Sequence, residues 1–250
     1  LPLVSLPDRA LLVARLVADE EDVASAALNA RSGGSAVNVR AAAFTSLEPA
    51  RDVVRLATNY DVELVLLDVA RELDGDRLPA DLAAIAERSP ADVAVLSGPA
   101  PDWRGGAGVF VPFGGGESDW AALELGAWLA AGTHVPLRLV GTRADPARGQ
   151  RDASRLLADA SLAVQRVVGV SAEPVLAEAT AEAFLAAVAS ASVVVSGLPT
   201  RWRAEGLGTI RSALVRRGRP PTLLVHRGTR PGGLAPRESL TRFSWSLERF

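Results

Sequence analysis

The residues best suited to chemistry in this sequence lie around position 208, where a polar loop gives way to a helical pattern. Gly208 and Thr209 open this pattern. The first N–H groups of such a helix have no partner inside the helix, and the helix dipole adds positive charge there, so together they can bind an anion such as a phosphate. Positive side chains flank the same point, namely Arg201, Arg203 and Arg211.

A second interpretation of these residues needs no ligand. Glycine is common at tight turns between a strand and a helix, so Gly206 and Gly208 can serve the turn alone while the arginines are solvated. The residues by themselves favour this interpretation and leave anion binding open. A phosphate cradle at Gly114-Gly115-Gly116, which precedes another helical pattern, is a further weak possibility beside a simple turn.

The elements that position these residues form a strand, loop, helix and strand. An apolar run at Val193–Gly197 ends in Ser-Gly, the helix after Gly208 stops at Gly218, and a second apolar run follows at Thr222–Val225. Short apolar runs of this kind are typical of buried parallel strands. The carboxyl ends of such strands are where α/β sheets bind ligands.

The same alternation extends along the whole chain. Apolar runs predict strands at 9–17, 36–44, 62–69, 92–96, 109–112, 136–140 and 163–168, and helical periodicity predicts helices at 20–31, 46–60, 79–88, 117–131, 146–160 and 173–189. A Pro- and Gly-rich stretch interrupts the pattern, which then restarts. We therefore expect an α/β protein with mostly parallel sheets, with a first unit at 1–98, a linker at 99–108, a second unit at 109–228 and an aromatic tail at 229–250. The first unit lacks an opening strand and helix.

Length and composition set the broad class. The chain has 250 residues, 48% of them hydrophobic and 22% charged, and a net charge of −2, which describes a globular protein with no charge signal for nucleic acid. It has no cysteine, so thiolate metal sites and a cysteine nucleophile are excluded. No apolar run approaches the roughly 20 residues that span a bilayer. The lack of methionine, even at position 1, predicts a fragment or a processed piece.

Two segments resemble the universal stress protein family. VFVPFGGG at 109–116 is similar to the opening strand of that family, and the stretch 192–227 is similar to its closing segment, where a G-x2-G-x9-G-[ST] loop holds ATP phosphates. Gly208-Thr209 matches the last two positions of that loop, whereas Gly197 is one position away from an earlier glycine. Gly114 stands where ATP-binding members have an aspartate.

What the resemblance implies is a nucleotide site that has degenerated. The residues it assigns to this site are Gly114, Gly197, Gly206, Gly208, Thr209, Arg203 and Arg211. ATP or another adenine nucleotide is the implied ligand, with weak or absent binding. We find no nucleophile elbow, zinc-protease motif or Walker A motif, so we expect no enzyme activity.

A closer resemblance is to the cytosolic C-terminal region of bacterial cation/proton antiporters of the monovalent cation:proton antiporter-2 type. It rests on the opening segment VFVPFGGGESDWAALELGAWLA, the closing segment 192–228 and the tail PGGLAPRESLTRF. It implies a soluble regulatory module on the cytoplasmic side of the cell membrane, with a transmembrane domain as partner, and a homodimer. The alternative is a free-standing universal stress protein that binds an adenine nucleotide.

Overall fold

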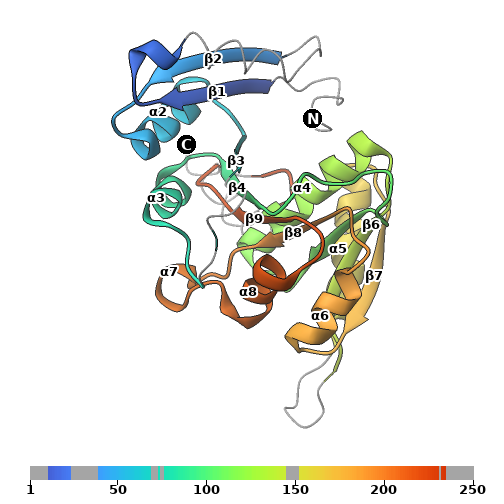
Figure 1. Ribbon diagram of the computed structural model, residues 1–250. Coiled ribbons are helices and arrows are strands. Elements are labelled where there is room, and N and C mark those ends of the chain that lie inside the picture. The colour runs from blue at the N-terminus through green and yellow to red at the C-terminus, as the bar shows by residue number, and fades with distance from the viewer. Residues whose placement is uncertain are drawn as a thin grey trace, which may run out of the picture.

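The computed structural model describes residues 11–23, 39–68, 73, 76–144, 152–230 and 232–234, and within them strands and helices alternate along the chain (Figure 1). Most of the strands join one seven-stranded sheet. In spatial order its strands are β3 (Leu64–Asp68), β4 (Asp92–Ser97), β9 (Thr222–His226), β8 (Val193–Gly197), β5 (Val109–Pro112), β6 (Leu137–Thr142) and β7 (Ala172–Ala177). The expected α/β fold with a mostly parallel sheet is confirmed.

One pair of strands in this sheet is antiparallel. β4 runs against β9, with Ala94 opposite Val225 and Val95 opposite Leu224. Strands from both sides of the linker 99–108 therefore belong to the same sheet. The sequence alone did not predict this pairing, because the two strands are similar apolar runs with no feature that identifies a partner.

A second, smaller sheet holds β1 (Leu11–Val17) and β2 (Val39–Thr45), which are parallel from Leu11 opposite Val39 to Val17 opposite Thr45. In Figure 1, β1 lies between β2 and the β3 end of the large sheet. Neither strand of the small sheet pairs with a strand of the large one.

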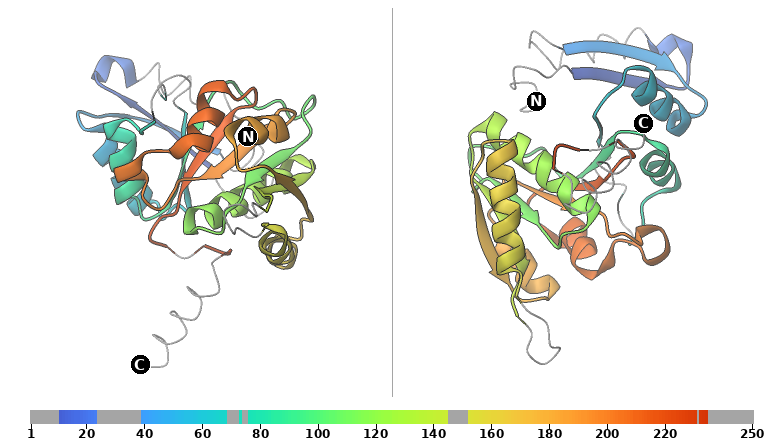
Figure 2. Two further views of the ribbon diagram at one scale, coloured as in Figure 1. Left: turned by 90° about the horizontal axis from the view of Figure 1, so that it is seen from below. Right: turned by 180° about the vertical axis from the view of Figure 1, so that it is seen from behind.

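Helices cover both faces of the large sheet. On one face lie α4 (Glu117–Thr133) and α5 (Ser154–Val167), and on the other lie α3 (Ala80–Arg88), α6 (Ala181–Val188) and α8 (Gly208–Arg217), as the opposite views of Figures 1 and 2 show. The remaining helices are α2 (Pro49–Asn59), the short α7 (Trp202–Glu205) and a 3-10 turn at Glu20–Asp22.

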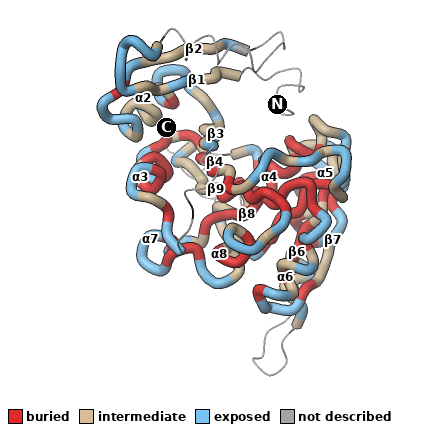
Figure 3. Tube along the Cα trace, viewed as in Figure 1, coloured by how far each residue is buried: buried red, intermediate tan, exposed pale blue. Residues whose placement is uncertain are grey.

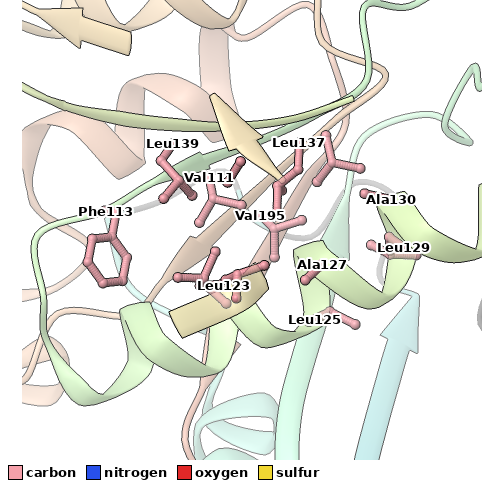
Figure 4. Packing of buried hydrophobic residues seen from close by; sticks show 14 of the residues in the cluster. Val111, Phe113, Leu123, Leu125, Ala127, Leu129, Ala130, Leu137, Leu139 and Val195 are labelled. Atoms are coloured by element: carbon pink, nitrogen blue, oxygen red, sulfur yellow. The ribbon is translucent and has the colours of Figure 1, made fainter. Parts of the chain in front are cut away.

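The main core lies between α4 and the strands β5, β6 and β8 (Figure 4). Residues 121–127 of α4 are all buried, and Glu124 is the one charged residue among them, so this part of the helix has no exposed polar stripe. Gly126 lets α4 lie directly on the sheet, because a Cβ there would come within 2.7 Å of Val111 Cγ2. The second half of the chain is accordingly rich in buried residues, whereas β1 and β2 have none among the residues whose burial is described (Figure 3).

Two expected elements are wrong. The predicted strand at 163–168 is the end of helix α5, in which Ala160 and Val164 are buried one turn apart, and Gly169 with φ +78° follows the helix. The predicted helix at 173–189 begins with strand β7, and only Ala181–Val188 is helical. Pro174 lies in β7, which is an edge strand of the sheet, where proline is tolerated.

The other expected strands, and the helices expected at 46–60, 79–88 and 117–131, are present with ends that differ by a few residues. The helix expected at 146–160 is displaced along the chain, since α5 runs from Ser154 to Val167, and residues 145–151 lie outside the described residues. Within the expected helix at 20–31, residues 20–22 form the 3-10 turn, and residues 24–38 lie outside the described residues. Most of the expected tail at 229–250 also lies outside them, since the description stops at Leu234. The linker 99–108 contains neither a helix nor a strand.

Candidate functional site

The candidate site lies at the carboxyl ends of β5 and β8. These strands are parallel neighbours, with Val109 opposite Val193 and Phe110 opposite Val194. The chain leaves β5 toward α4 on one face of the sheet and leaves β8 toward α8 on the other. This divergence is the topological switch point at which α/β folds bind ligands.

A glycine loop after β5 forms a cradle of backbone donors, and a side chain of the protein itself fills it. The N–H groups of Gly114 and Gly116 both donate to Oδ2 of Asp119, each at 3.1 Å. Gly115 between them has φ +86°, a conformation that favours glycine. Asp119 is in the first turn of α4 and is 6% exposed, so the cradle holds a buried carboxylate.

Arg211 of α8 completes the surroundings of this carboxylate. Its Nη2 lies 3.4 Å from Oδ1 of Asp119, and its Nε donates to the carbonyl oxygen of Gly197 at the end of β8. The guanidinium therefore bridges the start of α4 and the end of β8. We call the glycine loop 114–116, Asp119 and Arg211 the cradle.

The electrostatics of the cradle have two opposed contributions. Burial raises the pKa of Asp119, while the charge of Arg211 and the two glycine N–H groups lower it, and burial has the larger effect. The pKa of this carboxyl is thus above its ordinary value even though its partners are well placed.

Gly197 has a packing role at the same place. A Cβ on this residue would lie 2.4 Å from the backbone nitrogen of Asp119 and equally close to the carbonyl carbon of Ser118. The end of β8 therefore abuts the first turn of α4 directly. This contact explains the glycine without a ligand.

The predicted anion site at the start of α8 lies at an open groove of about 550 Å³. Gly208 and Thr209 are exposed at its edge, and Thr180 and Glu182 of the α6 side face them across it. Gly208 has φ +75°, so it adopts a conformation that a β-branched residue would strain. A Gly208→Val exchange would therefore disturb the backbone as well as any ligand.

The remaining predicted residues, Arg203 and Gly206, contact α3 and the segment that precedes it. Arg203 forms an ion pair with Glu87 of α3 and stacks on the ring of Trp202, 5.5 Å from its centroid. Gly206, with φ +74°, passes so close to Asp76 that a Cβ would lie 2.4 Å from its carbonyl oxygen. The structure thus gathers Gly114, Gly197 and Arg211 around the cradle, sets Gly208 and Thr209 beside the groove, and engages Arg203 and Gly206 elsewhere.

A second set of charges, of which Glu124 is buried and Asp92 and Arg227 are partly buried, lies beyond the end of β9. Nη1 of Arg227 is 3.3 Å from Oδ2 of Asp92 and 3.7 Å from Oε2 of Glu124. Glu124 also accepts the N–H groups of Gly233 and Leu234, at 3.0 and 3.1 Å. Burial raises the pKa of Asp92, against the charge of Arg227. This network fixes residues 232–234 onto α4, which is a structural role.

The sequence analysis missed Asp119, Asp92 and Glu124. Asp119 could have been found, because a carboxylate three residues after a helix N-cap commonly reaches back to the free N–H groups of the first turn. Asp92 and Glu124 had no such signal, since their partner Arg227 is more than 100 residues away from each in sequence.

Within the described ranges, no three His, Asp or Glu side chains are grouped as metal ligands would be. In the same part of the chain, no helix combines the length and the apolar character needed to cross a membrane.

Comparisons with known proteins are informative for the fold. No family model and no curated protein matches the chain. Among solved structures, the chain is similar to the cytoplasmic domain of a prokaryotic cation chloride cotransporter, with a TM-score of 0.61 and 12% identity over 93% of this chain and 90% of that one. It is also similar to a universal stress protein from Archaeoglobus fulgidus DSM 4304, with a TM-score of 0.59 and 14% identity over 84% of this chain and 78% of that one. A functionally unknown protein from Pseudomonas aeruginosa PAO1 has a TM-score of 0.53 and 16% identity, over 90% of this chain and 94% of that one. At these identities the likeness shows the α/β fold that universal stress proteins and this transporter domain share with the chain.

Proposed function

We propose that the chain is a non-catalytic regulatory module of a bacterial cation/proton antiporter of the monovalent cation:proton antiporter-2 type. In this proposal it is soluble, lies on the cytoplasmic side of the cell membrane, acts on a transmembrane domain of the same protein and forms a homodimer. The fold supports the proposal, because a transporter's cytoplasmic domain shares it over 93% of this chain. The residue resemblance of the opening and closing segments at 109–130 and 192–228 supports the antiporter type.

The proposal that the module is non-catalytic rests on one observation, which is that Asp119 already fills the donors of the glycine loop. Asp119 already supplies the negative charge that the N–H groups of Gly114 and Gly116 and the guanidinium of Arg211 can neutralise. A phosphate at the same donors would meet this buried carboxylate and be repelled by it. The proposed site is therefore satisfied from within the chain, and we assign it no nucleotide chemistry.

We further propose that the chain consists of two related units. The strand pairs support this arrangement, since β1–β2 and β3–β4 are parallel in the first half as β6–β7 and β8–β9 are in the second. The helices agree, because α2 and α3 follow β2 and β3 as α6 and α8 follow β7 and β8. The antiparallel pairing of β4 with β9 is the contact that a twofold axis between equivalent strands would produce.

Calorimetric titration of the chain with ATP and magnesium tests whether the site has lost nucleotide binding. We expect no binding heat at millimolar ATP. A dissociation constant in the low micromolar range, equivalent to about −8 kcal/mol, would overturn the proposed degeneracy.

A transport assay tests the regulatory role. The gene that encodes this chain is expressed with and without the region 1–250, and cation-dependent proton flux is measured in inverted membrane vesicles. We expect the truncated protein to retain exchange with an altered dependence on pH or cation concentration. A gene product without multiple membrane spans, or exchange kinetics unchanged by the truncation, would contradict the proposal.

The groove beside α8 favours a second candidate, a free-standing universal stress protein that binds an adenine nucleotide. It is lined by Thr209 and Arg211 near the first turn of α8 and by Arg217 at the end of that helix, and its volume of about 550 Å³ is in the range of small-molecule sites. The same titration separates the candidates, since binding that is lost in an Arg217→Ala variant would support this one.

A further inference from the structure

β1 and β3 are the end strands of the two sheets. Among the described strands, β1 pairs only with β2 and β3 pairs only with β4. Both strands are apolar, with sequences LLVARLV and LVLLD. In Figure 1, β1 is the strand of the small sheet that lies toward β3. An apolar strand edge of this kind is a template for pairing with a further strand.

The second half of the chain shows what occupies the equivalent position there. β6 and β8, which correspond to β1 and β3, are not neighbours, because β5 lies between them and is parallel to both. Helix α4 follows β5 and covers β5, β8 and β9 on one face. The described part of the first half contains no counterpart of β5 or of α4.

The strands β1 and β3 are more exposed than the corresponding strands β6 and β8, as expected if a covering strand and helix are missing beside them. In β8, Val193, Val194 and Val195 are 0% exposed, whereas Leu66 at the centre of β3 is 46% exposed. Leu66 is two residues after Leu64, which packs against the α4-side core, so both lie on the face that α4 covers elsewhere in the sheet. The same contrast holds for β1, in which no residue is buried, and β6, in which four of six residues are.

We propose that the space between β1 and β3 is the docking site for a strand and helix of the same polypeptide that precede Leu1. The strand would be parallel to both neighbours and would join the two sheets into one, and the helix would cover Leu66. This inference rests on the proposed relationship between the two units.

The source of the strand follows from the connection. Parallel neighbours need a crossover of a dozen or more residues, usually a helix. In the second half, 28 residues separate the start of β5 at Val109 from the start of β6 at Leu137. The same spacing before Leu11 sets the missing strand upstream of Leu1. Its composition should match VFVP of β5, which is apolar on both faces because all four residues are buried.

Amide hydrogen exchange tests the proposal. The chain of 250 residues is compared with a chain extended by the 40 residues that its gene encodes before Leu1, and size-exclusion chromatography with light scattering reports the oligomeric state. In the extended chain we expect exchange of the β1 and β3 amides to slow at least tenfold, without a change of oligomeric state, together with protection of one strand and one helix in the added segment.

A pair of variants makes the readout specific. Leu66→Asp in the extended chain puts a charge under the docked helix, so we expect it to restore fast exchange in β1 and β3. Leu162→Asp is the control, because Leu162 on α5 is 51% exposed and lies on a different helix. We expect this variant to leave the exchange of both strands unchanged.

Several outcomes overturn the proposal. They are unchanged exchange of β1 and β3 on extension, protection that arises only with dimerisation and so points to a second copy, and a gene that encodes no strand and helix in the added segment. Membrane spans upstream without a strand and helix would overturn this proposal and leave the transporter function standing. A docked strand and helix without membrane spans upstream would support this proposal and overturn the transporter function.

Discussion

The carboxylate of Asp119 lies 3.4 Å from the guanidinium of Arg211, and this contact joins the first turn of α4 to α8 across the end of β8. Opposite charges in a buried setting are costly to separate, because removing one leaves the other without compensation.

Asp119→Ala should destabilise the protein by about 2–3 kcal/mol, since it leaves two N–H groups of the glycine loop and the charge of Arg211 without an acceptor. Urea unfolding followed by circular dichroism measures the difference. Asp159→Ala, an exposed aspartate on α5, is the matched control and should change stability by less than about 0.5 kcal/mol. Equal effects of the two exchanges would contradict the structural role of the cradle.

The Asp119→Ala variant should also gain an anion site. Once the carboxylate is gone, the N–H groups of Gly114 and Gly116 and the guanidinium of Arg211 can accept a phosphate ion. We expect inorganic phosphate to raise the melting temperature of the variant above that of the same protein in sodium chloride of equal ionic strength.

Two controls accompany this phosphate experiment. The wild-type protein should show no such rise, because Asp119 fills the donors, and the double variant Asp119→Ala/Arg211→Ala should lose it. A rise of similar size in all three proteins would mean that phosphate stabilises them by a general salt effect.

The titration of Asp119 should contribute to the pH dependence of the free energy of unfolding. Burial raises its pKa in the folded protein above the ordinary value of 3.8. As pH rises from that value through the raised one, the unfolded chain releases this proton first, so the folded state loses stability. Asp119→Asn has no such titration, and the raised pKa of Asp92 is common to both proteins. We therefore expect the stability of the wild type relative to this variant to fall as pH rises above about 3.8. Urea unfolding of both proteins between pH 4 and pH 7 measures this trend, and a relative stability that increases with pH would contradict it.

Gly197 and Gly208 should respond differently to the same exchange. Gly197→Ala forces a methyl group to within 2.4 Å of the α4 backbone, so the strand end or the helix must move. Gly208→Ala meets open space, and its cost is the φ of +75°, about 1–2 kcal/mol. Thermal unfolding should therefore show the larger loss for Gly197→Ala. A larger loss of stability for Gly208→Ala would contradict this expectation and indicate that a side chain at position 208 is not in open space.

Much of the fold could be predicted from local patterns. The strands and helices around 193–226 follow from apolar runs and from the stops at Gly218 and Pro220, which act within a few residues. The errors arose where a local signal had two meanings. Pro174 is compatible with the start of a helix and with an edge strand, and only the position of β7 in the sheet decides between them.

The candidate site was harder to predict, because its partners are far apart in sequence. Arg211 and Asp119 are brought together by the adjacency of β5 and β8, which periodicity does not specify. Gly114 was identified as the residue in place of a family aspartate. That another aspartate, five positions later, fills the loop is a property of the folded first turn of α4.

The antiparallel ladder between β4 and β9 has a consequence for biosynthesis. Val93 pairs with His226, which the ribosome adds 133 residues later. At a translation rate of about 5–20 residues per second, the synthesis of β9 therefore follows that of β4 by roughly 7–27 s. During this interval the apolar edge of β4 lacks its partner strand, and only synthesis of β9 covers that edge.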